Sequence, residues 1–343
     1  METLYLLKDY IIKYKTIVIV TVLILLLISY IFIRRINTNE KFTNVLNPDV
    51  IILTTRLGKN YGNRIADEMV KMRRGLNIRV MNIDQLTTKC DKLIKNTKLI
   101  IARAATPTDN DWMRCLKRIE KNGTIVMNPT KILQLTSNKL VSSIYFLREG
   151  LPHPDSKDGT KSEPLQTLSN VRNMLDKHKK IIIKPYTSRS QGQFVQIINN
   201  TMTDNEILGK IDTIPTDKFV IQEFVSYKAI YRVIVVNNKA LPMAYKDVPT
   251  KNKWKVSVCL NPKMSFIPNP PKKLLRTAER VQKTLLNGGV HFIDLFELDN
   301  GKYVISEINT ACSLILHEKK AKMANHPYHN IAKHLAKYYL TLL

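Results

Sequence analysis

The sequence predicts an α/β protein in which a small parallel sheet precedes a larger α+β region. Between residues 48 and 129, short apolar runs alternate with segments of helical periodicity, as they do in parallel sheets. Further along, strand-like runs follow one another, and two of them face each other across a hairpin turn. Near the N-terminus, 18 successive residues carry no charge, which predicts a membrane-spanning helix.

The predicted membrane helix covers residues 16–33 and is apolar on every face. At about 1.5 Å per residue it would span roughly 27 Å, close to the thickness of the hydrocarbon layer. A cleaved signal peptide would have a shorter apolar region and a small-residue cleavage site. A buried core helix is the other alternative. We expect a membrane anchor over residues 1–35 and a polar linker over residues 36–47.

The first soluble domain is predicted to cover residues 48–129. Its strands are expected where short runs of aliphatic residues occur, with helices between them. The predicted strands are 50–54, 78–81, 99–102 and 124–127. Helices are predicted at 63–74, around Leu93, and from a cap at Asp109 through Ile119 to an end at Gly123.

The second soluble domain is predicted to cover residues 130–343. It opens with helices at 138–149 and 168–178. The predicted strands are 180–184, 194–198, 219–223, 231–236, 240–245, 291–297 and 303–308. The last two flank Asp299-Asn300-Gly301, a hairpin turn signal. Two further helices are expected at 272–286 and 330–342.

Composition narrows the function classes. A hydrophobic fraction of 44% is ordinary for a globular protein and excludes disorder as the main state. The net charge of +26 favours polyanionic partners, although a Lys-, Asn- and Ile-rich composition also follows from AT-rich coding, so specific nucleic-acid binding is not expected. The four cysteines are far apart, which argues against a zinc ribbon and a disulfide-stapled secreted module and fits a reducing compartment.

Three oxygen-bearing side chains come together on the predicted hairpin. Glu307 and Asn309 are two residues apart and share a face of one strand, and Asp294 lies on the strand before it. Oxygen ligands of this kind suit a hard cation such as Mg²⁺ bridging phosphates. The alternative is that the outward face of an amphipathic hairpin is simply polar.

A lysine ends another apolar strand. Lys184 follows three isoleucines, and a loop rich in hydroxyl and amide groups comes next. The lysine could neutralise a phosphate and the loop amides could surround its oxygens, whereas a solvated strand-end lysine is the alternative. The candidate phosphate-binding residues of the loop are Ser188, Ser190, Gln191 and Gly192.

Two further segments could contact a ligand. Residues 222–225 (Gln-Glu-Phe-Val) end an apolar strand, where backbone groups could meet a flat ring and the Glu223 carboxylate a ribose hydroxyl. Arg232 opens the next apolar strand and could clamp an oxyanion, or be an edge charge. Cys312, three residues past Asn309, has no general base in view and is interpreted as a packing thiol.

The order of these segments is more specific than any one of them. The series NKL, LREGLPHPDS, IIIKPYTSRSQG, VIQEFV, YRVIVVNNKA and FIDLFELDNGKYVISEIN resembles the ATP-grasp superfamily. It is most similar to the RimK-type, glutathione synthetase-like branch, which adds glutamate to a carboxyl terminus. The upstream pieces Asn128-Pro129 and Ile101-Ala102-Arg103 are also similar to that branch, so the resemblance covers roughly residues 50–340.

The resemblance implies an ATP-grasp fold behind a pre-ATP-grasp domain, and an enzyme that uses ATP with Mg²⁺ or Mn²⁺. A carboxylate would attack the γ-phosphate, and an amine would displace phosphate from the acyl phosphate to form an amide. It implies phosphate binding by Lys139 and Lys184, adenine and ribose binding by Gln222, Glu223, Phe224 and Val225, acyl-phosphate binding by Arg232, and metal binding by Asp294, Glu307 and Asn309. The expected substrates are a carboxylate acceptor and an amino-acid-like amine.

The chain also departs from the family pattern. The phosphate loop keeps one glycine, Gly192, and the Trp254–Ser257 element has serine in place of asparagine. A catalytically inactive ATP-binding scaffold and a basic nucleic-acid-binding protein on the same fold are therefore the alternatives. The one apolar segment predicts a single-pass membrane protein. The use of ATP favours a body on the cytosolic side.

Overall fold

The computed structural model describes residues 21–29, 48–55, 58–86, 97–103, 111–187, 194–250, 263–286, 288–312 and 314–343. The chain divides into two compact units, Met1–Leu46 and Asn47–Leu343. In the first unit, residues 21–29 are helical and their side chains are exposed. Half of the predicted span at 16–33 lies outside the described residues. Among those that are described, no helix is both long and apolar enough to cross a bilayer.

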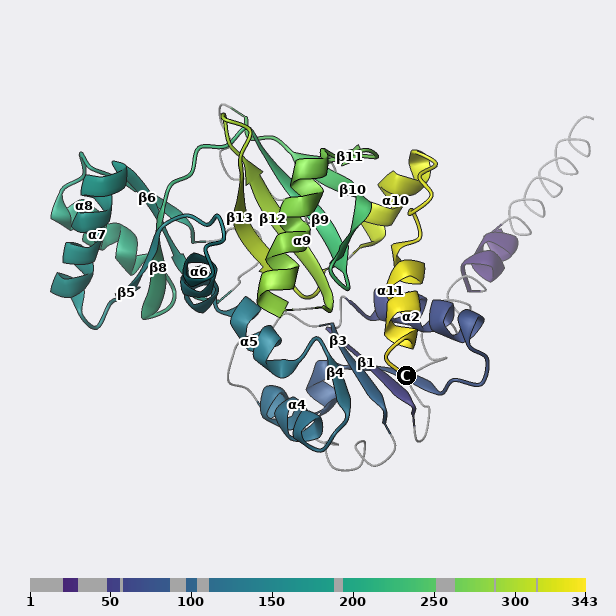
Figure 1. The fold of residues 1–343 in the computed structure, drawn as a ribbon. Coiled ribbons are helices and arrows are strands. Elements are labelled where there is room, and N and C mark those ends of the chain that lie inside the picture. Colours follow the sequence, from purple (N-terminus) through teal and green to yellow (C-terminus); the bar gives the residue numbers. More distant parts are fainter. Residues whose placement is uncertain are drawn as a thin grey trace, which may run out of the picture. The chain divides into compact units, whose positions relative to one another are not determined.

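The second unit begins with the predicted parallel sheet (Figure 1). Its strand order is β2-β1-β3-β4, so the connection from β2 to β3 crosses over β1. The strands are β1 (Val50–Thr54), β2 (Ile78–Asn82), β3 (Leu99–Arg103) and β4 (Ile125–Met127). The helices of this part are α2 (Lys59–Met72), the short 3₁₀ helix η2 (Ile83–Gln85) and α4 (Asp111–Lys121).

A four-stranded antiparallel sheet follows, with the order β5-β8-β6-β7. The helices α7 and α8 pack against one face of it (Figure 1). Its strands are β5 (Ser156–Thr160), β6 (Lys180–Pro185), β7 (Gln196–Asn199) and β8 (Lys218–Glu223). The helices before and within it are α5 (Thr130–Ser137), α6 (Lys139–Arg148), α7 (Pro164–His178) and α8 (Asp204–Asp212).

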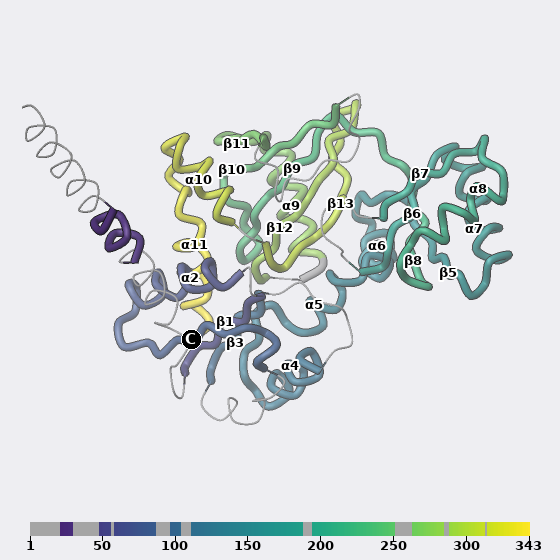
Figure 2. Tube along the Cα trace, turned by 180° about the vertical axis from the view of Figure 1, so that it is seen from behind, coloured from purple at the N-terminus to yellow at the C-terminus, as the bar shows by residue number. Residues whose placement is uncertain are grey.

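The third sheet has five antiparallel strands in the order β11-β10-β9-β12-β13. Helix α9 lies across it in Figure 1, and Figure 2 shows the strands from the other side. The strands are β9 (Ala229–Val236), β10 (Lys239–Asp247), β11 (Ser265–Ile267), β12 (Val290–Glu297) and β13 (Tyr303–Asn309). The remaining helices are α9 (Lys272–Leu286), α10 (Ile315–Met323) and α11 (Ile331–Leu340).

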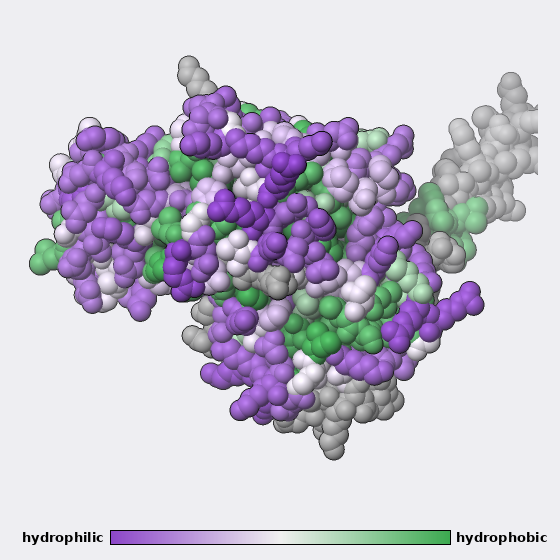
Figure 3. All heavy atoms as spheres, viewed as in Figure 1, coloured by the Kyte–Doolittle hydropathy of each residue, from purple (hydrophilic) through white to green (hydrophobic). Residues whose placement is uncertain are grey.

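Each sheet has its own hydrophobic core. Buried aliphatic side chains from the strands pack against α4 in the first sheet, against α7 and α8 in the second, and against α9 in the third. The face drawn in Figure 3 is covered mainly by hydrophilic side chains, in keeping with the many lysines of the chain. The apolar strand runs in the sequence thus correspond to separate buried layers.

Helix α11 returns to the first domain and packs against α2 (Figure 1). The Glu318 carboxylate of α10 ties these helices together. Its Oε1 accepts hydrogen bonds from the Tyr61 hydroxyl at 3.2 Å and the Ala332 backbone N–H at 2.8 Å, and Arg64 forms an ion pair with Oε2. Burial raises the pKa of Glu318, and these partners oppose the rise. Helix α2 is therefore joined through one carboxylate to α10 and α11, which are distant from it in sequence.

The predicted strands and the helix at 272–286 are confirmed within a few residues. The sequence-based interpretation missed α5, α8, α10, β5 and β11. Cys115 forms a disulfide, which the wide spacing of the cysteines did not predict. The missed elements are short, at three to nine residues each, so their periodicity is weak.

We predict that Gly62→Ala destabilises the protein. A Cβ at this position of α2 would lie 2.7 Å from Thr54 Cγ2 and 3.0 Å from Val80 Cγ1, so the helix would have to move away from the sheet. We expect a loss of about 1–3 kcal/mol in the free energy of unfolding, measured by urea denaturation.

Gly209→Ala is the matched control. Gly209 also lies inside a helix, α8, but a Cβ there meets no atom within 4 Å. Only the gain in helix propensity remains, so this variant should be more stable by about 0.5–1 kcal/mol. Equal effects of the two substitutions would contradict the close packing of α2 on β1.

Candidate active site

A row of charged side chains crosses the five-stranded sheet. Arg232 of β9 lies directly opposite Asp294 of β12, and Asp294 lies directly opposite Glu307 of β13. Directly opposite residues on antiparallel strands point to the same face, with Cβ atoms about 4.5–5.5 Å apart. Two otherwise apolar strands thus place one cation beside two anions near the middle of the sheet.

Arg232 and Asp294 form a buried, bidentate ion pair. Arg232 Nε donates to Oδ1 of Asp294 over 2.7 Å, and Nη2 donates to Oδ2 over 2.6 Å. The two residues are only 3% and 5% exposed. Burial raises the pKa of Asp294, Arg232 opposes this, and the neighbouring Glu307 raises it further. The arginine therefore holds the Asp294 carboxylate in a fixed position.

Asn309 extends this row along β13. It lies two residues beyond Glu307 and directly opposite Phe292. The register between β12 and β13 shifts after Asp294, as at a β-bulge, and bulges are common next to active sites. Asp294, Glu307 and Asn309 therefore share the face that the hairpin spacing predicted.

These three residues fit a magnesium ion that also binds phosphates. Among the residues that the structure describes, no group of three or more His, Cys, Asp or Glu side chains could hold a metal. The trio instead offers two carboxylates and one amide. Mg²⁺ is usually held by one or two carboxylates together with substrate phosphates and water, so a sparse set of this kind suits it.

Two lysines come together from different elements. Lys184 lies near the end of β6, and Lys139 is the first residue of α6. The Lys139 backbone N–H donates to the Tyr186 carbonyl over 2.9 Å, and Asn138 pairs with Thr187 in an isolated bridge. The start of α6 is thereby fixed to the chain that leaves β6.

Lys184 connects this pair of lysines to the charged row. Its Nζ donates to Gln222 Oε1 over 2.8 Å, and Gln222 Nε2 donates to the Ser156 hydroxyl over 2.8 Å. Burial and the charge of Lys139 lower the pKa of Lys184 to about 7, whereas Glu307 favours the charged form. Lys139 and Glu307 are therefore both near enough to Lys184 to act on its charge.

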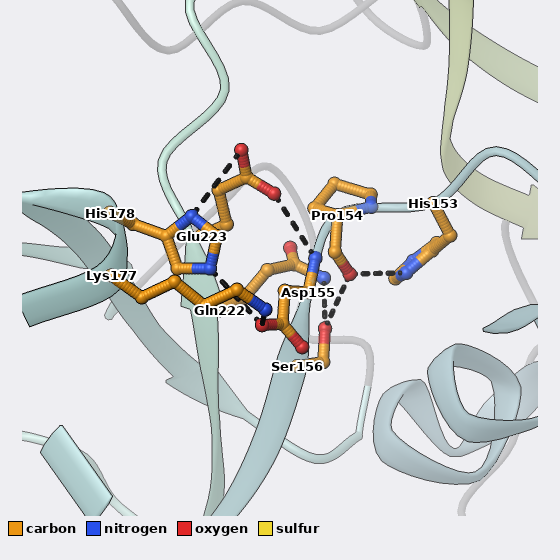
Figure 4. A network of polar contacts seen from close by, with 8 residues as sticks. All are labelled: His153, Pro154, Asp155, Ser156, Lys177, His178, Gln222 and Glu223. Atoms are coloured by element: carbon orange, nitrogen blue, oxygen red, sulfur yellow. Dashed lines mark hydrogen bonds and ion pairs between the residues drawn. The ribbon is translucent and has the colours of Figure 1, made fainter. Parts of the chain in front are cut away.

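Figure 4 shows the polar network around the end of β8. Glu223 Oε2 accepts from the Asp155 backbone N–H over 3.2 Å, and Oε1 lies 3.7 Å from His178 Nδ1. Asp155 in turn binds Lys177 at 2.7 Å and His178 at 3.1 Å. The Glu223 side chain is thus held by the protein at the position where a ribose contact was predicted.

The segment after Glu223 is held as well. The Phe224 backbone N–H donates to the Lys180 carbonyl over 3.1 Å, and the Lys180 ammonium lies 4.3 Å from the centre of the Phe224 ring. Val225 is half-buried in the connection from β8 to β9. Residues 222–225 therefore form a fixed connection between the two antiparallel sheets.

Residues 163–319 match the family model of the prokaryotic glutathione synthetase ATP-grasp domain. This range includes Lys184, Gln222–Val225, Arg232, Asp294, Glu307 and Asn309, and it excludes Lys139. Over these residues the chain is similar to the ATP-grasp superfamily. The superfamily predicted from the sequence is confirmed, and the similarities lie in its RimK-like branch.

Two curated relatives of the chain are glutamate–LysW ligases named ArgX. The enzyme of Sulfurisphaera tokodaii is 24% identical over 195 residues, and that of Sulfolobus acidocaldarius is 25% identical over 195 residues. In each case the match covers 56% of this chain and 66% of the relative. The matched region therefore spans just under two thirds of the length of these relatives.

Solved ATP-grasp structures have the same fold. The ligase PsnB, in complex with a minimal precursor, superposes with a TM-score of 0.61 at 14% identity, covering 86% of this chain and 100% of PsnB. A RimK-domain protein from Sphaerobacter thermophilus gives 0.59 at 14% identity, covering 84% and 98%. The D-alanine–D-alanine ligase of Bacillus anthracis gives 0.60 at 15% identity, covering 85% and 97%.

The structure thus brings together Lys139, Lys184, Arg232, Asp294, Glu307 and Asn309. The hinge residues adjoin them through Gln222. The other predicted residues of the ATP-grasp site, Ser188, Ser190, Gln191 and Gly192, lie outside the described residues, as does the Trp254–Ser257 element. Their roles stay predictions.

Sequence reasoning missed His153 beside the ATP-grasp site. Its Nδ1 lies 2.7 Å from the Pro154 carbonyl, and its ring packs on Phe146 at 5.0 Å between ring centres. Burial and the charge of Lys184 lower its pKa to about 3, so the imidazole is neutral near pH 7. The sequence around His153 did not predict its burial, because the residue lies between two prolines in a polar stretch.

We predict that Lys184 makes the stability of the free protein rise with pH. Its pKa is about 7 in the folded state and 10.5 ordinarily, so between these values the unfolded chain binds more protons and stability increases as pH rises. From pH 7 to pH 9, wild type should gain roughly 1–2 kcal/mol relative to Lys184→Met in urea denaturation.

The exposed Lys218 on β8 provides the control. Lys218→Met should follow the pH dependence of the wild type. If Lys184→Met also follows it, Lys184 is not a desolvated lysine next to Lys139.

Proposed function

We propose that the protein is an ATP-dependent carboxylate–amine ligase that works through an acyl phosphate. The observation that carries this proposal is the convergence of Lys139 and Lys184 with the carboxylates of Asp294 and Glu307 where two antiparallel sheets meet. Cations for phosphates and carboxylates for a metal thus lie within one site. The named relatives are ligases, which supports the same reaction class.

Each part of the site has a role in this reaction. Lys139 and Lys184 neutralise the phosphates of ATP, and the Gln222–Val225 connection holds adenine and ribose. Asp294, Glu307 and Asn309 would hold Mg²⁺, which offsets charge on the transferred phosphate when it is bound. Arg232 positions Asp294 through its two hydrogen bonds and lies next to the place where the acyl phosphate would form.

The reaction has two steps. An acceptor carboxylate oxygen attacks the γ-phosphorus, the bond to the β-phosphate oxygen breaks, and ADP leaves. The lone pair of an amine nitrogen then attacks the acyl carbon, the carbon–oxygen bond to phosphate breaks, and the nitrogen loses a proton. The side chains act mainly by positioning and by neutralising charge, which accounts for most of the catalysis of phosphoryl transfer.

The substrates belong to broad classes. The relatives include ligases named for LysW and D-alanine and one complexed with a precursor peptide. By analogy, the acceptor is the carboxylate of a peptide, protein tail or small molecule, and the amine belongs to an amino acid. The strongly positive charge of the chain favours acidic acceptors over neutral ones.

We predict that Glu307→Gln abolishes ATP turnover. The amide keeps the shape of the side chain but removes the negative charge that a metal ion needs next to Asp294. ADP formation should fall at least 100-fold at low Mg²⁺ in the presence of acceptor and amine. Asn309→Asp, which adds a ligand charge, should lose much less activity.

The measurement is ADP release against Mg²⁺ concentration for wild type and both variants. Normal turnover of Glu307→Gln at low Mg²⁺ would show that the row is only the polar face of a hairpin. ATP binding without turnover in the wild type would favour the inactive scaffold. Salt-sensitive DNA binding that ATP does not change would favour the nucleic-acid-binding alternative.

We also propose that residues 16–33 anchor the protein in a membrane with the body in the cytosol. The segment is uncharged over 18 residues, and residues 21–29 within it are helical with exposed apolar side chains. ATP supply supports the cytosolic side, whereas a disulfide at Cys115 is more typical of an oxidising compartment.

We predict that the full chain resists carbonate extraction from membranes. A shortened protein that begins near residue 40 should be extracted, because it lacks the apolar segment. Protease added from outside should leave the body intact as long as the membrane of cells or spheroplasts is closed. It should digest the body once the membrane is permeabilised, because the protease then reaches the cytosol. Recovery of the full chain in the carbonate-soluble fraction would contradict the anchor, and digestion from outside intact cells would contradict the topology.

A further inference from the structure

A pocket lies among α2, α10 and the residues just before α11. Its volume is about 400 Å³, which is within the usual range for small-molecule sites. Arg64 lines it from α2, Lys319 and Lys322 line it from α10, and His329 and Asn330 line it from the connection to α11. None of these residues belongs to the candidate active site. The pocket is therefore a second place on the molecule where a ligand could bind.

Two lysines of α10 provide positive charge to this pocket. Lys319 and Lys322 share a helix face with Ile315, which also lines the pocket. Both lysines are exposed, and neither ammonium has an ion-pair or hydrogen-bond partner among the residues that the structure describes. Their charges are therefore available to a ligand in the pocket.

The acidic residue of the pocket does not balance these lysines. Glu318 is 4% exposed and forms an ion pair with Arg64. Its Oε1 also accepts hydrogen bonds from the Tyr61 hydroxyl and the Ala332 backbone N–H. The carboxylate is thus neutralised and held within the protein. Three basic side chains against one carboxylate give the lining a formal charge of +2 when His329 is neutral.

This charge matches that of a phosphate monoester. Such a group carries about −1.5 to −2 at pH 7, whereas a single carboxylate carries −1 and would leave one cation uncompensated. Each ammonium can donate charge-assisted hydrogen bonds to phosphate oxygens. A water molecule takes up about 30 Å³ in the liquid, so the pocket has room for more than a bare phosphate ion. The Ile315 side chain, 46% exposed, offers an apolar contact to the carbon part of an ester.

We propose that this pocket binds an organic phosphate monoester, with Lys319 and Lys322 on the phosphate and Ile315 against the carbon part. The phosphates of ATP are assigned to Lys139 and Lys184, so this is a second anion site, and it does not depend on the ligase reaction. A soluble ester and a lipid headgroup can carry the same phosphate group. The experiment below distinguishes these two sources.

The probe is phenyl phosphate, titrated into the full chain and followed by ligand-observed NMR. Mg²⁺ and the ATP analogue AMPPNP are present throughout, so that the proposed ATP site is occupied. Phenyl sulfate is the matched ligand, because it has a similar shape but a single negative charge. Wild type should bind phenyl phosphate at least 10-fold more tightly than phenyl sulfate.

The test variant is Lys319→Met/Lys322→Met. It should bind phenyl phosphate about 10–100-fold more weakly than wild type, because two charged donors are lost. The matched control is Lys320→Met/Lys337→Met, which removes two charges from α10 and α11 at positions that do not line the pocket. The control should bind phenyl phosphate as wild type does. Far-UV circular dichroism should be the same for all three proteins, since both substituted pocket lysines are exposed.

Vesicles distinguish the two sources of the phosphate. Phosphatidic acid has a phosphate monoester as its headgroup, and phosphatidylcholine does not. If a lipid headgroup occupies the pocket, vesicles that contain phosphatidic acid should displace phenyl phosphate, and vesicles of phosphatidylcholine alone should not. Displacement by neither kind of vesicle would assign the pocket to a soluble ester.

Three results would overturn the proposal. These are no binding of phenyl phosphate to wild type, equal affinities for the phosphate and the sulfate, and equal weakening in the two double variants. The last result would show that only the net charge of the chain attracts the ester. Failure of AMPPNP to bind would instead contradict the proposed ATP site, and the comparison of the two double variants would still decide the role of the pocket.

Discussion

The ion pair between Arg232 and Asp294 is the constraint on which the site depends. Two charges in the interior of a sheet are tolerable only when they neutralise each other with good geometry. The bidentate contact meets that condition and requires β9 and β12 to keep one register. Because β13 pairs with β12, the same register fixes Glu307 and Asn309.

The second antiparallel sheet is tied to this row through Lys184. The lysine is held by Gln222, which binds Ser156, so its position depends on three strands of that sheet. A cation pair of Lys139 and Lys184 is unfavourable by itself, and the Glu307 carboxylate offsets it. The attraction between Lys184 and Glu307 thus favours the arrangement in which the two sheets face each other. A bound polyanion would further reduce the repulsion between Lys139 and Lys184.

The sequence predicted those parts of the molecule that local patterns encode. Apolar strand runs gave the sheets, and the Asp-Asn-Gly turn gave the β12–β13 hairpin with Glu307 and Asn309 on one face. The Arg232–Asp294 pair was not predicted because the register of β9 and β12 joins segments about sixty residues apart. Strand β5 was missed because Ser-Lys-Asp-Gly-Thr has almost no apolar content, and only its pairing with β8 makes it a strand.

The contacts of Glu223 and Arg103 could not be predicted from the sequence for the same reason. The Glu223 carboxylate binds Asp155 and His178, which come from other parts of the chain, and nothing near residue 223 indicates this. Arg103 was noted only as part of a family-like segment, whereas its burial depends on α2 and β12. Long-range contacts decide both cases.

The packing of α11 on α2 has a consequence for biosynthesis. Helix α2 belongs to the first soluble domain to be translated, yet the Glu318 carboxylate that binds Tyr61 and the helix that covers α2 are about 250 residues further on. While the two antiparallel sheets are being synthesised, the face of α2 that α11 covers in the folded protein is therefore still exposed. The first domain reaches its final packing only after α11 has left the ribosome, so it is completed later than both antiparallel sheets, which are made after it.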